Sequence, residues 1–373
     1  MRNLIWTALV TACLAPSAVR GGDEDLAKRL ADLRAAGPQS AGQAKAAAAW
    51  TQIAQEDPSS LPVILAGMDG ANPLAANWIA TAAQAVVEHT LEKSERLPQA
   101  ELEQFVVERK HSPRGRRLAY EFLVQVDPAA EQRLIPRMLD DPNLELRRDA
   151  VERLVADAEK ASQAGNGDTA IGLFRRAFEA ARDLDQLKRL AQRLRKLGQP
   201  ADLARQLGYV VCWKLIGPFD NTDRKGFDAV YPPENEIRTE AAYPGKQGEV
   251  RWVDFASEDD LGRIDFFKPF EKQREVVGYA MTEFVAAEKR EVEIRMSSFN
   301  ATKLWLNGRL VDEHPVYHSG SQPDQFVNRV VLQPGRNVIL VKVCQNEQTQ
   351  DWAQRWDFQL RVCDETGGAV LSK

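Results

Sequence analysis

The sequence predicts a chain that is α-helical in its first half and built of β-strands in its second half. Two observations support this fold class. Residues 23–207 are rich in Ala, Leu, Arg and Glu, whereas residues 209–373 contain most of the Val, Phe, Trp and Gly-containing turns. Apolar residues recur at helical spacing in the first half and alternate along short segments in the second. Helices that precede strands, rather than alternate with them, indicate a multidomain α-then-β protein.

Composition places the chain among ordinary globular proteins. It has 373 residues, of which 44% are hydrophobic and 28% are charged, with a net charge of −5. Loss of residues 1–22 would remove two arginines and no acid, leaving −7. This balance argues against a general polyanion binder, so no nucleic-acid partner is expected.

Residues 1–22 are predicted to be a signal peptide. Arg2 precedes an apolar run of about ten residues from Leu4 to Leu14, which is too short to span a bilayer. We therefore expect an exported protein, periplasmic or extracellular or associated with the cell envelope. A lipoprotein signal ending at Cys13 and a buried first helix are the alternatives. No later segment has 18 consecutive apolar residues, so no transmembrane segment is expected in the mature chain.

Residues 23–165 show weak internal repetition. Arg116-Arg117-Leu118-Ala119 recurs as Arg147-Arg148-Asp149-Ala150, and Asp141-Pro142-Asn143 breaks the chain between two helical stripes. The second stripe contains Ala150, Val151 and Leu154. These residues resemble HEAT repeats, which implies stacked helix pairs and a surface for a protein partner.

Residues 166–208 contain two further apolar stripes, and the helix breaker Gly198-Gln199-Pro200 follows the second stripe. They resemble a TPR-type helix pair. A helical scaffold that binds nothing remains the alternative for the whole first half.

Residues 209–373 are predicted to form a β-sandwich of about ten strands, the first of which ends at Gly217-Pro218 because Pro218 cannot donate to a ladder. The expected strands are 209–216, 250–255, 264–267, 276–285, 291–296, 303–306, 309–311, 325–332, 337–344 and 356–362. The segments WKLIGPFDN, GFDAVYPPE, LWLNGRLV and LQPGRNVILVKVC occur in this order. They resemble galactose-binding-like jelly-roll domains, a resemblance that implies a carbohydrate-binding or purely structural role.

The segment KLWLNGRLV predicts a β-hairpin. Asn307-Gly308 suits a type I′ turn, and a two-residue turn would pair Leu306 with Arg309, Trp305 with Leu310 and Leu304 with Val311. Both faces of the hairpin are then apolar. One must enter the core, and the other needs a cover from a loop, the helical domain or a ligand.

Aromatic and amide side chains are the candidate ligand-binding residues, because aromatic rings suit the apolar faces of sugars. Each tryptophan could instead be a core residue, but the polar neighbours of Trp352 predict an exposed loop. The candidates are Trp305, Tyr317, Asn346, Asp351, Trp352 and Trp356.

Metal and catalytic signals are weak. Asp220, Asp223 and Asp228 could hold a structural calcium ion, without the spacing of an EF-hand, and no other cofactor is indicated. His314 and His318 are four residues apart, but Pro315 argues against the helix that would align them. There is no G-x-S-x-G, H-E-x-x-H or P-loop motif, so no catalytic residue is assigned.

Three cysteines follow the predicted leader. Alternation places Cys344 and Cys363 on outward faces of their strands, where they could form a disulfide only if the strands are neighbours. Unpaired thiols are the alternative.

The sequence therefore predicts an exported, non-catalytic recognition or scaffold protein. The helical repeats would contact a protein, and the sandwich would contact a glycan or an assembly. The alternatives are a polysaccharide-active hydrolase or its accessory subunit, and a purely structural envelope protein.

Overall fold

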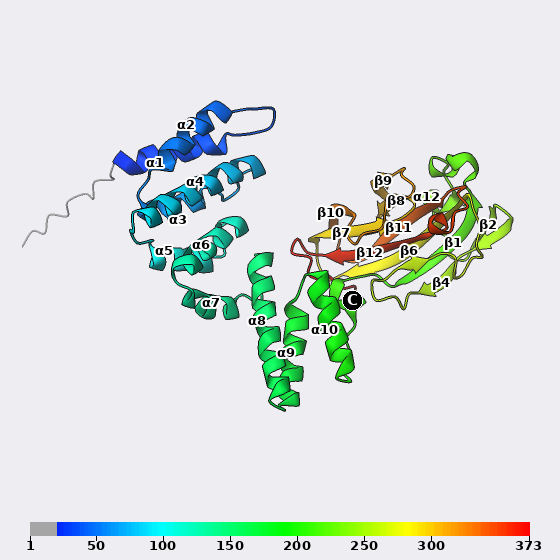
Figure 1. Cartoon of the computed structure of the whole chain (residues 1–373). Helices are drawn as coiled ribbons and strands as arrows, with labels where there is room; N and C mark the ends of the chain where they lie inside the picture. The colour runs from blue at the N-terminus through cyan, green and yellow to red at the C-terminus, as the bar shows by residue number, and fades with distance from the viewer. Residues whose placement is uncertain (1–20) are drawn as a thin grey trace, which may run out of the picture. The chain divides into compact units, whose positions relative to one another are not determined.

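The computed structural model describes residues 21–373, and the predicted signal peptide and Cys13 lie outside the described residues except for Gly21 and Gly22. Helices come first and an antiparallel β domain follows, which confirms the predicted fold class (Figure 1). The chain divides into two compact units between Leu146 and Arg147. This division lies inside a helix, well before residue 208, where the composition changes. Within residues 21–373, no helix is both long and apolar enough to cross a membrane.

The first unit is a stack of helix pairs. α1 packs on α2, α3 on α4, and α5 on α6; α4 also contacts α1 and α2, and α6 contacts α3. The elements are α1 (Gly21–Arg34), α2 (Gln43–Ile53), η1 (Pro58–Ser60), α3 (Leu61–Ala66), α4 (Pro73–Glu92), α5 (Gln99–Val107), α6 (Pro113–Val126), α7 (Ala129–Leu134) and η2 (Ile135–Arg137). Each pair buries an apolar stripe against its neighbour.

Two asparagines cap long helices in the same way. Asn72 accepts hydrogen bonds from Leu74 N and Ala75 N, both at 3.0 Å, and its amide donates to Ala36 O at 2.9 Å. Asn143 likewise accepts from Leu146 N at 2.9 Å, and its amide donates to Pro113 O. Each asparagine therefore satisfies the start of one helix and ties it to the preceding helix pair.

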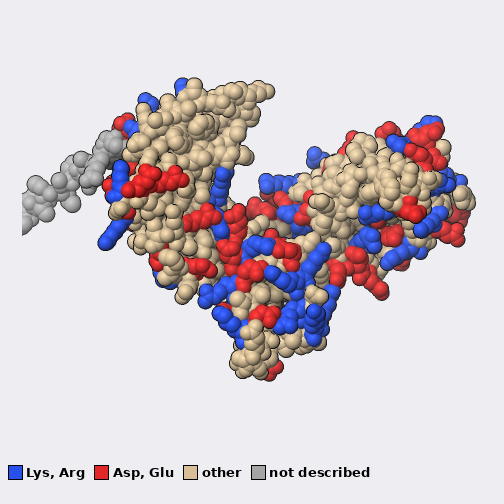
Figure 2. Space-filling view, in the orientation of Figure 1, with Lys and Arg blue, Asp and Glu red and all other residues tan. Residues whose placement is uncertain are grey.

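The second unit begins with α8, which starts before the unit boundary, and its helices pack against the β domain. Arg361 of the sheet donates to Leu207 O at 3.1 Å, and Arg195 forms a two-pronged ion pair with Asp260 at 2.6 and 2.7 Å. Lys and Arg gather on these helices, where several pair with acids of the neighbouring helix (Figure 2). The helices are α8 (Leu144–Gln163), α9 (Gly167–Ala180), α10 (Leu184–Lys196) and α11 (Leu203–Leu207).

The β domain is a sandwich of two antiparallel sheets and a small hairpin. The strand orders are β4-β1-β6-β11-β8-β9 and β10-β7-β12-β5, and β2 pairs with β3. The strands are β1 (Cys212–Asp220), β2 (Ala242–Gly245), β3 (Gly248–Arg251), β4 (Val253–Ala256), β5 (Ile264–Asp265), β6 (Val276–Ala286), β7 (Arg290–Ser298), β8 (Ala301–Leu306), β9 (Arg309–His314), β10 (Phe326–Leu332), β11 (Gly335–Gln345) and β12 (Asp357–Cys363).

A second apolar core lies on the outer face of the six-stranded sheet. Leu304 and Leu306 point between the two sheets, whereas Trp305 packs with Phe219, Tyr279 and their neighbours on the opposite side. The cover is the chain's own segment 221–252, which contains η3 (Thr222–Phe227), α12 (Pro232–Asn235) and the β2–β3 hairpin. This segment supplies the cover that the apolar hairpin requires, so no ligand is needed there.

The Asn-Gly hairpin has the predicted turn. Asn307 has a φ of 52° and Gly308 a φ of 78°, and Leu306 pairs with Arg309 and Trp305 with Leu310. The third predicted pair is wrong, because a bulge follows and Leu304 pairs with Asp312 instead of Val311.

Other strand boundaries also differ from the prediction. β1 continues past Gly217-Pro218 to Asp220, because the register shifts between Ile216 and Phe219 and Pro218 is not required to donate to the ladder. The segment 250–255 divides between β3 and β4, which belong to different sheets. Between the first two predicted strands, Pro232 and Pro233 begin the short helix α12.

The two cysteines on adjacent predicted strands are not bonded. β11 lies in the six-stranded sheet and β12 in the four-stranded sheet, so Cys344 and Cys363 are on different sheets. Both are free and buried, and Cys212 is free and exposed.

Candidate functional site

Polar and aromatic loops gather at one end of the sandwich. β1, β9 and β11 finish at this end, and β6, β8, β10 and β12 begin there. We call it the loop end and define it as residues 221–231, 266–275, 299–300, 315–325 and 346–355. It brings together four of the predicted binding residues, Tyr317, Asn346, Asp351 and Trp352.

Trp352 is the most exposed aromatic side chain of the loop end. It lies on η4 (Asp351–Ala353), and the residue is 61% exposed. Its ring meets Phe299 and His318 in edge-to-face contacts, with centroid distances of 6.3 and 5.2 Å. These two rings hold the indole in place and leave much of its surface accessible, as stacking on a sugar ring requires.

His318 links Trp352 to the buried base of the loop end. Its Nε2 atom accepts a hydrogen bond from the amide of Asn346 at 2.9 Å, which leaves the proton on Nδ1. The Nδ1 atom is buried and has no partner within residues 21–373. Burial lowers the pKa of His318, so the ring is neutral at pH 7.

Tyr317 supports the site from below. Its hydroxyl accepts from the amide of Asn221 at 3.1 Å, and the guanidinium of Arg224 lies 5.2 Å from its ring centre. Arg224 Nε in turn donates to Glu347 at 3.1 Å. Burial raises the pKa of Tyr317 to about 12, so its hydroxyl stays neutral at physiological pH. Asn346 is almost fully buried, and Asp351 is exposed beside Trp352.

Two predicted binding residues belong to the cores instead. Trp356 is fully buried, donates from Nε1 to Val343 O at 2.9 Å, and stacks on Phe266 with ring centres 4.8 Å apart. Trp305 lies beneath residues 221–252 and is 9% exposed. Neither ring presents a face to solvent, so both predictions are corrected to core packing.

Sequence reasoning missed Phe299 and Arg224 and did not consider His318 as a binding residue. Phe299 was missed because it lies in a two-residue turn between β7 and β8, where nothing local marks a ring as a support for Trp352. The only available signal was the polar stretch around Trp352 itself.

The three candidate calcium ligands do not form a common cation site. Asp220 accepts from Thr222 Oγ1 at 2.6 Å and pairs with Lys246 at 3.2 Å, and these contacts lower its pKa. Asp223 pairs with Lys225 at 2.9 Å. Asp228 does not join them in a ligand group, since residues 21–373 contain no set of three His, Cys, Asp or Glu side chains arranged to hold a metal. His314 is engaged separately, with Asp312 at 2.8 Å.

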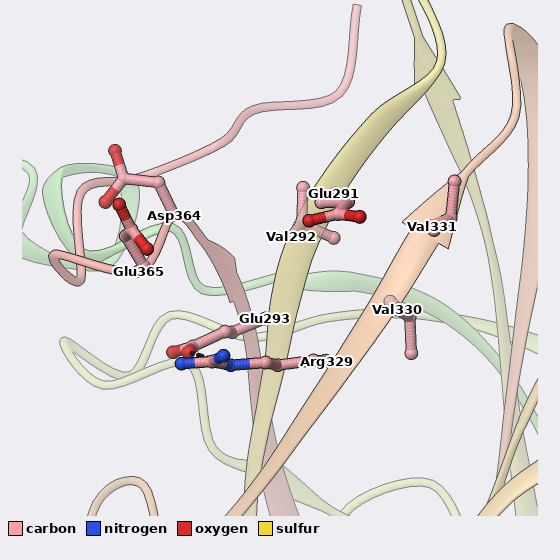
Figure 3. A pocket seen from close by; sticks show the side chains of 8 residues that line it. All are labelled: Glu291, Val292, Glu293, Arg329, Val330, Val331, Asp364 and Glu365. Carbon is pink, nitrogen blue, oxygen red and sulfur yellow. Dashed lines mark ion pairs between the residues drawn. The ribbon is translucent and has the colours of Figure 1, made fainter. Parts of the chain in front are cut away.

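A concave site lies apart from the loop end, on the outer face of the four-stranded sheet. We call it the acidic hollow; its volume is about 470 Å³. Arg329 lies against Glu293, with Nε 3.4 Å from the carboxylate (Figure 3). Glu293 also pairs with Arg295. The lining residues are Glu291, Val292, Glu293, Arg329, Val330, Val331, Asp364 and Glu365.

Comparison with known proteins assigns no family. No family model and no curated protein matches the chain. Among solved structures, an anti-sigma factor domain-containing protein from Clostridium clariflavum is 12% identical, with a TM-score of 0.25, over 44% of this chain and 45% of that chain. A beta-glucosidase from Kluyveromyces marxianus is 10% identical, with a TM-score of 0.26, over 76% of this chain and 35% of that chain. A GH31 alpha-xylosidase from Xanthomonas citri is 11% identical, with a TM-score of 0.19, over 30% and 15%. The chain thus spans less than half the length of these proteins, and at such TM-scores the likeness assigns neither fold family nor activity.

Proposed function

We propose that this protein is an exported, non-catalytic recognition protein that binds carbohydrate at the loop end of its β-sandwich. The observation that carries the proposal is Trp352, 61% exposed and held in place by Phe299 and His318. A buried polar atom without a hydrogen-bond partner is costly, so the Nδ1 atom of His318 also favours a polar ligand. An exposed ring beside an unused donor matches the apolar face and hydroxyl groups of a sugar.

The helical first unit is proposed to hold a protein partner. The stacked pairs and the repeated caps at Asn72 and Asn143 support the resemblance to HEAT repeats. A stack of this kind offers a long surface of solvent-exposed helix faces, and such surfaces commonly bind proteins. The apolar run at residues 4–14 supports export.

A glycan array probed with the full chain tests the carbohydrate proposal. We expect binding to a subset of glycans, a loss of at least tenfold in affinity for Trp352→Ala, and partial retention for Trp352→Phe. Val230→Ala is the matched control, because Val230 is 63% exposed at the same loop end. Equal losses in Trp352→Ala and Val230→Ala, or binding to no glycan, would refute carbohydrate recognition at this site and leave the structural envelope protein as the alternative.

The hydrolase alternative is favoured by one observation, the four carboxylates of the acidic hollow. A glycosidase needs a carboxylic acid with a raised pKa beside an ionised one. In Asp364, burial acts to raise the pKa, but hydrogen bonds from Thr366 and Gly368 outweigh it and the pKa is lowered. The test is whether the protein releases reducing sugar from a glycan that it binds on the array. If it does, and if Glu291→Gln abolishes the release, the hydrolase alternative replaces the non-catalytic proposal.

A further inference from the structure

The two sheets of the sandwich have four edge strands, and three of them are protected against pairing with another chain. β4 has four residues and β5 has two, and short edges offer few unpaired backbone groups. β9 contains a bulge and carries Arg309, Asp312 and Glu313. Bulges and charges of this kind prevent a second strand from docking.

β10 is less protected, because it is long, has no bulge and carries Arg329 as its one charged residue. Its seven residues pair with β7 without a bulge, from Phe326 opposite Met296 to Leu332 opposite Arg290. Within the part of the chain that the structure describes, no strand pairs with its other side. The outer face of the strand carries Val327, 50% exposed, Arg329, and Val331, 37% exposed. A long, regular edge with exposed valines is a surface to which another strand can add.

The charges around β10 distinguish among the ways in which two copies of this strand could pair. In a dimer whose two-fold axis is perpendicular to the sheet, the outer faces of the two copies lie on the same side. The axis can pass through residue 328, 329 or 330, and each position gives a different pairing register. An axis at Arg329 would place two guanidinium groups opposite each other. An axis at Asn328 would place Arg329 opposite Val327 of the second copy. The residue that pairs with Val327 on β7 is Arg295. Both arrangements bring like charges together.

An axis at Val330 has complementary charges. Arg329 then lies opposite Val331 of the second copy, and the neighbour of Val331 on β7 is Glu291 of the acidic hollow. Strands are about 4.8 Å apart, so an arginine side chain that leaves its 3.4 Å contact with Glu293 of its own chain can extend across the valine toward that carboxylate. Figure 3 shows Arg329 and Val331 on β10, with Glu291 on β7 beside the hollow.

We propose that two copies of this chain pair through β10 in the register centred on Val330, and that Arg329 of each copy enters the acidic hollow of the other. The two four-stranded sheets then form one continuous sheet. This inference is independent of carbohydrate binding at the loop end, because it uses none of the same residues.

Sedimentation velocity of the full chain over a concentration series tests this pairing. We expect a monomer–dimer equilibrium, with an association constant at least tenfold weaker for Val331→Lys, because the new ammonium group would lie beside Arg329 of the other copy. Val253→Lys is the matched control, because Val253 on the β4 edge has the same 37% exposure. Circular dichroism melting of each variant verifies that it is folded.

Arg329→Ala distinguishes the registers. It weakens the dimer at least tenfold in the Val330-centred register, whereas it strengthens a dimer whose axis passes through Arg329. The charge exchange Arg329→Glu with Glu291→Arg is expected to restore dimerisation that either single change abolishes. A chain that stays monomeric throughout, a dimer unaffected by Val331→Lys, or one strengthened by Arg329→Ala would overturn the proposal.

Discussion

The ammonium nitrogen of Lys342, a fully buried residue, lies 2.9 Å from Oε1 of Glu234. Its other two hydrogen bonds go to Phe227 O at 3.0 Å and Ala229 O at 2.7 Å. All three N–H groups of the ammonium therefore have partners. Because Lys342 is on β11 and its partners are in segment 221–252, this cluster fastens the cover of the second core to the sheet.

We predict that Lys342→Met destabilises the sandwich by about 3–5 kcal/mol, since it leaves the carboxylate of Glu234 without its buried cation. Urea unfolding followed by tryptophan fluorescence measures the change. The double variant Lys342→Met with Glu234→Gln should lose less than Lys342→Met alone. Lys225→Met is the control, because the Lys225–Asp223 pair is exposed to solvent and should contribute little to stability. Similar losses for the buried and exposed lysines would contradict this assignment.

In the first unit, two arginines test again whether a buried ion pair contributes more to stability than an exposed one. Arg116 forms two hydrogen bonds of 2.7 Å with Asp141, and both side chains are buried. Arg109 pairs with Asp140 at 2.6 Å, but these side chains are 49% and 75% exposed. We expect Arg116→Met to cost about 3–5 kcal/mol and Arg109→Met less than about 1 kcal/mol. Far-UV circular dichroism during urea unfolding measures both, and a larger loss in Arg109→Met would refute the prediction.

Alanine substitutions at Gly208 and Gly165 distinguish the cost of a steric overlap from the cost of a left-handed backbone conformation. Gly208 has a φ of 80° and Gly165 a φ of 79°, but a Cβ atom at Gly208 would overlap the carbonyl oxygen of Val362, whereas one at Gly165 meets nothing within 4 Å. We expect Gly165→Ala to cost about 1 kcal/mol, from the left-handed conformation alone. Gly208→Ala should cost at least twice as much, because α11 must move away from β12. Thermal unfolding of the two variants measures the difference, and equal shifts in Tm would count against the close contact.

Local sequence patterns predicted the order of helices and strands and the Asn-Gly turn, because these depend on neighbours in the chain. They also predicted an exposed Trp352 from its polar neighbours, but they did not show that Trp356, four residues later in the same stretch, is a core residue. Trp352 is exposed because it precedes β12 in a loop, whereas Trp356 meets Phe266, about ninety residues earlier in the chain. The cover over Trp305 was also out of reach, since the position of segment 221–252 depends on Lys342 and other distant contacts.

We expect buried tyrosines to determine how the stability of the fold changes with pH above about pH 10. Burial raises the pKa values of Tyr209 and Tyr317 to about 12 in the folded chain, whereas an unfolded tyrosine ionises near about 10. Above about pH 10 the unfolded state therefore binds fewer protons than the folded state, and stability falls as the pH rises toward about 12. Below about pH 10 both states keep the proton and this contribution is constant.

Replacing one of these hydroxyls tests the sign directly. We expect Tyr317→Phe to make the loss of stability between about pH 10 and about pH 12 shallower, because one titrating group is removed. Urea midpoints from about pH 8 upward measure the slope, and absorbance at the tyrosinate band follows ionisation in the folded chain. Tyr243→Phe is the control, because the Tyr243 hydroxyl makes only an exposed 3.4 Å hydrogen bond to Arg238 O. A slope unchanged by Tyr317→Phe would show that the hydroxyl is ionised as easily in the folded chain as in the unfolded one, which the buried contact with Asn221 opposes.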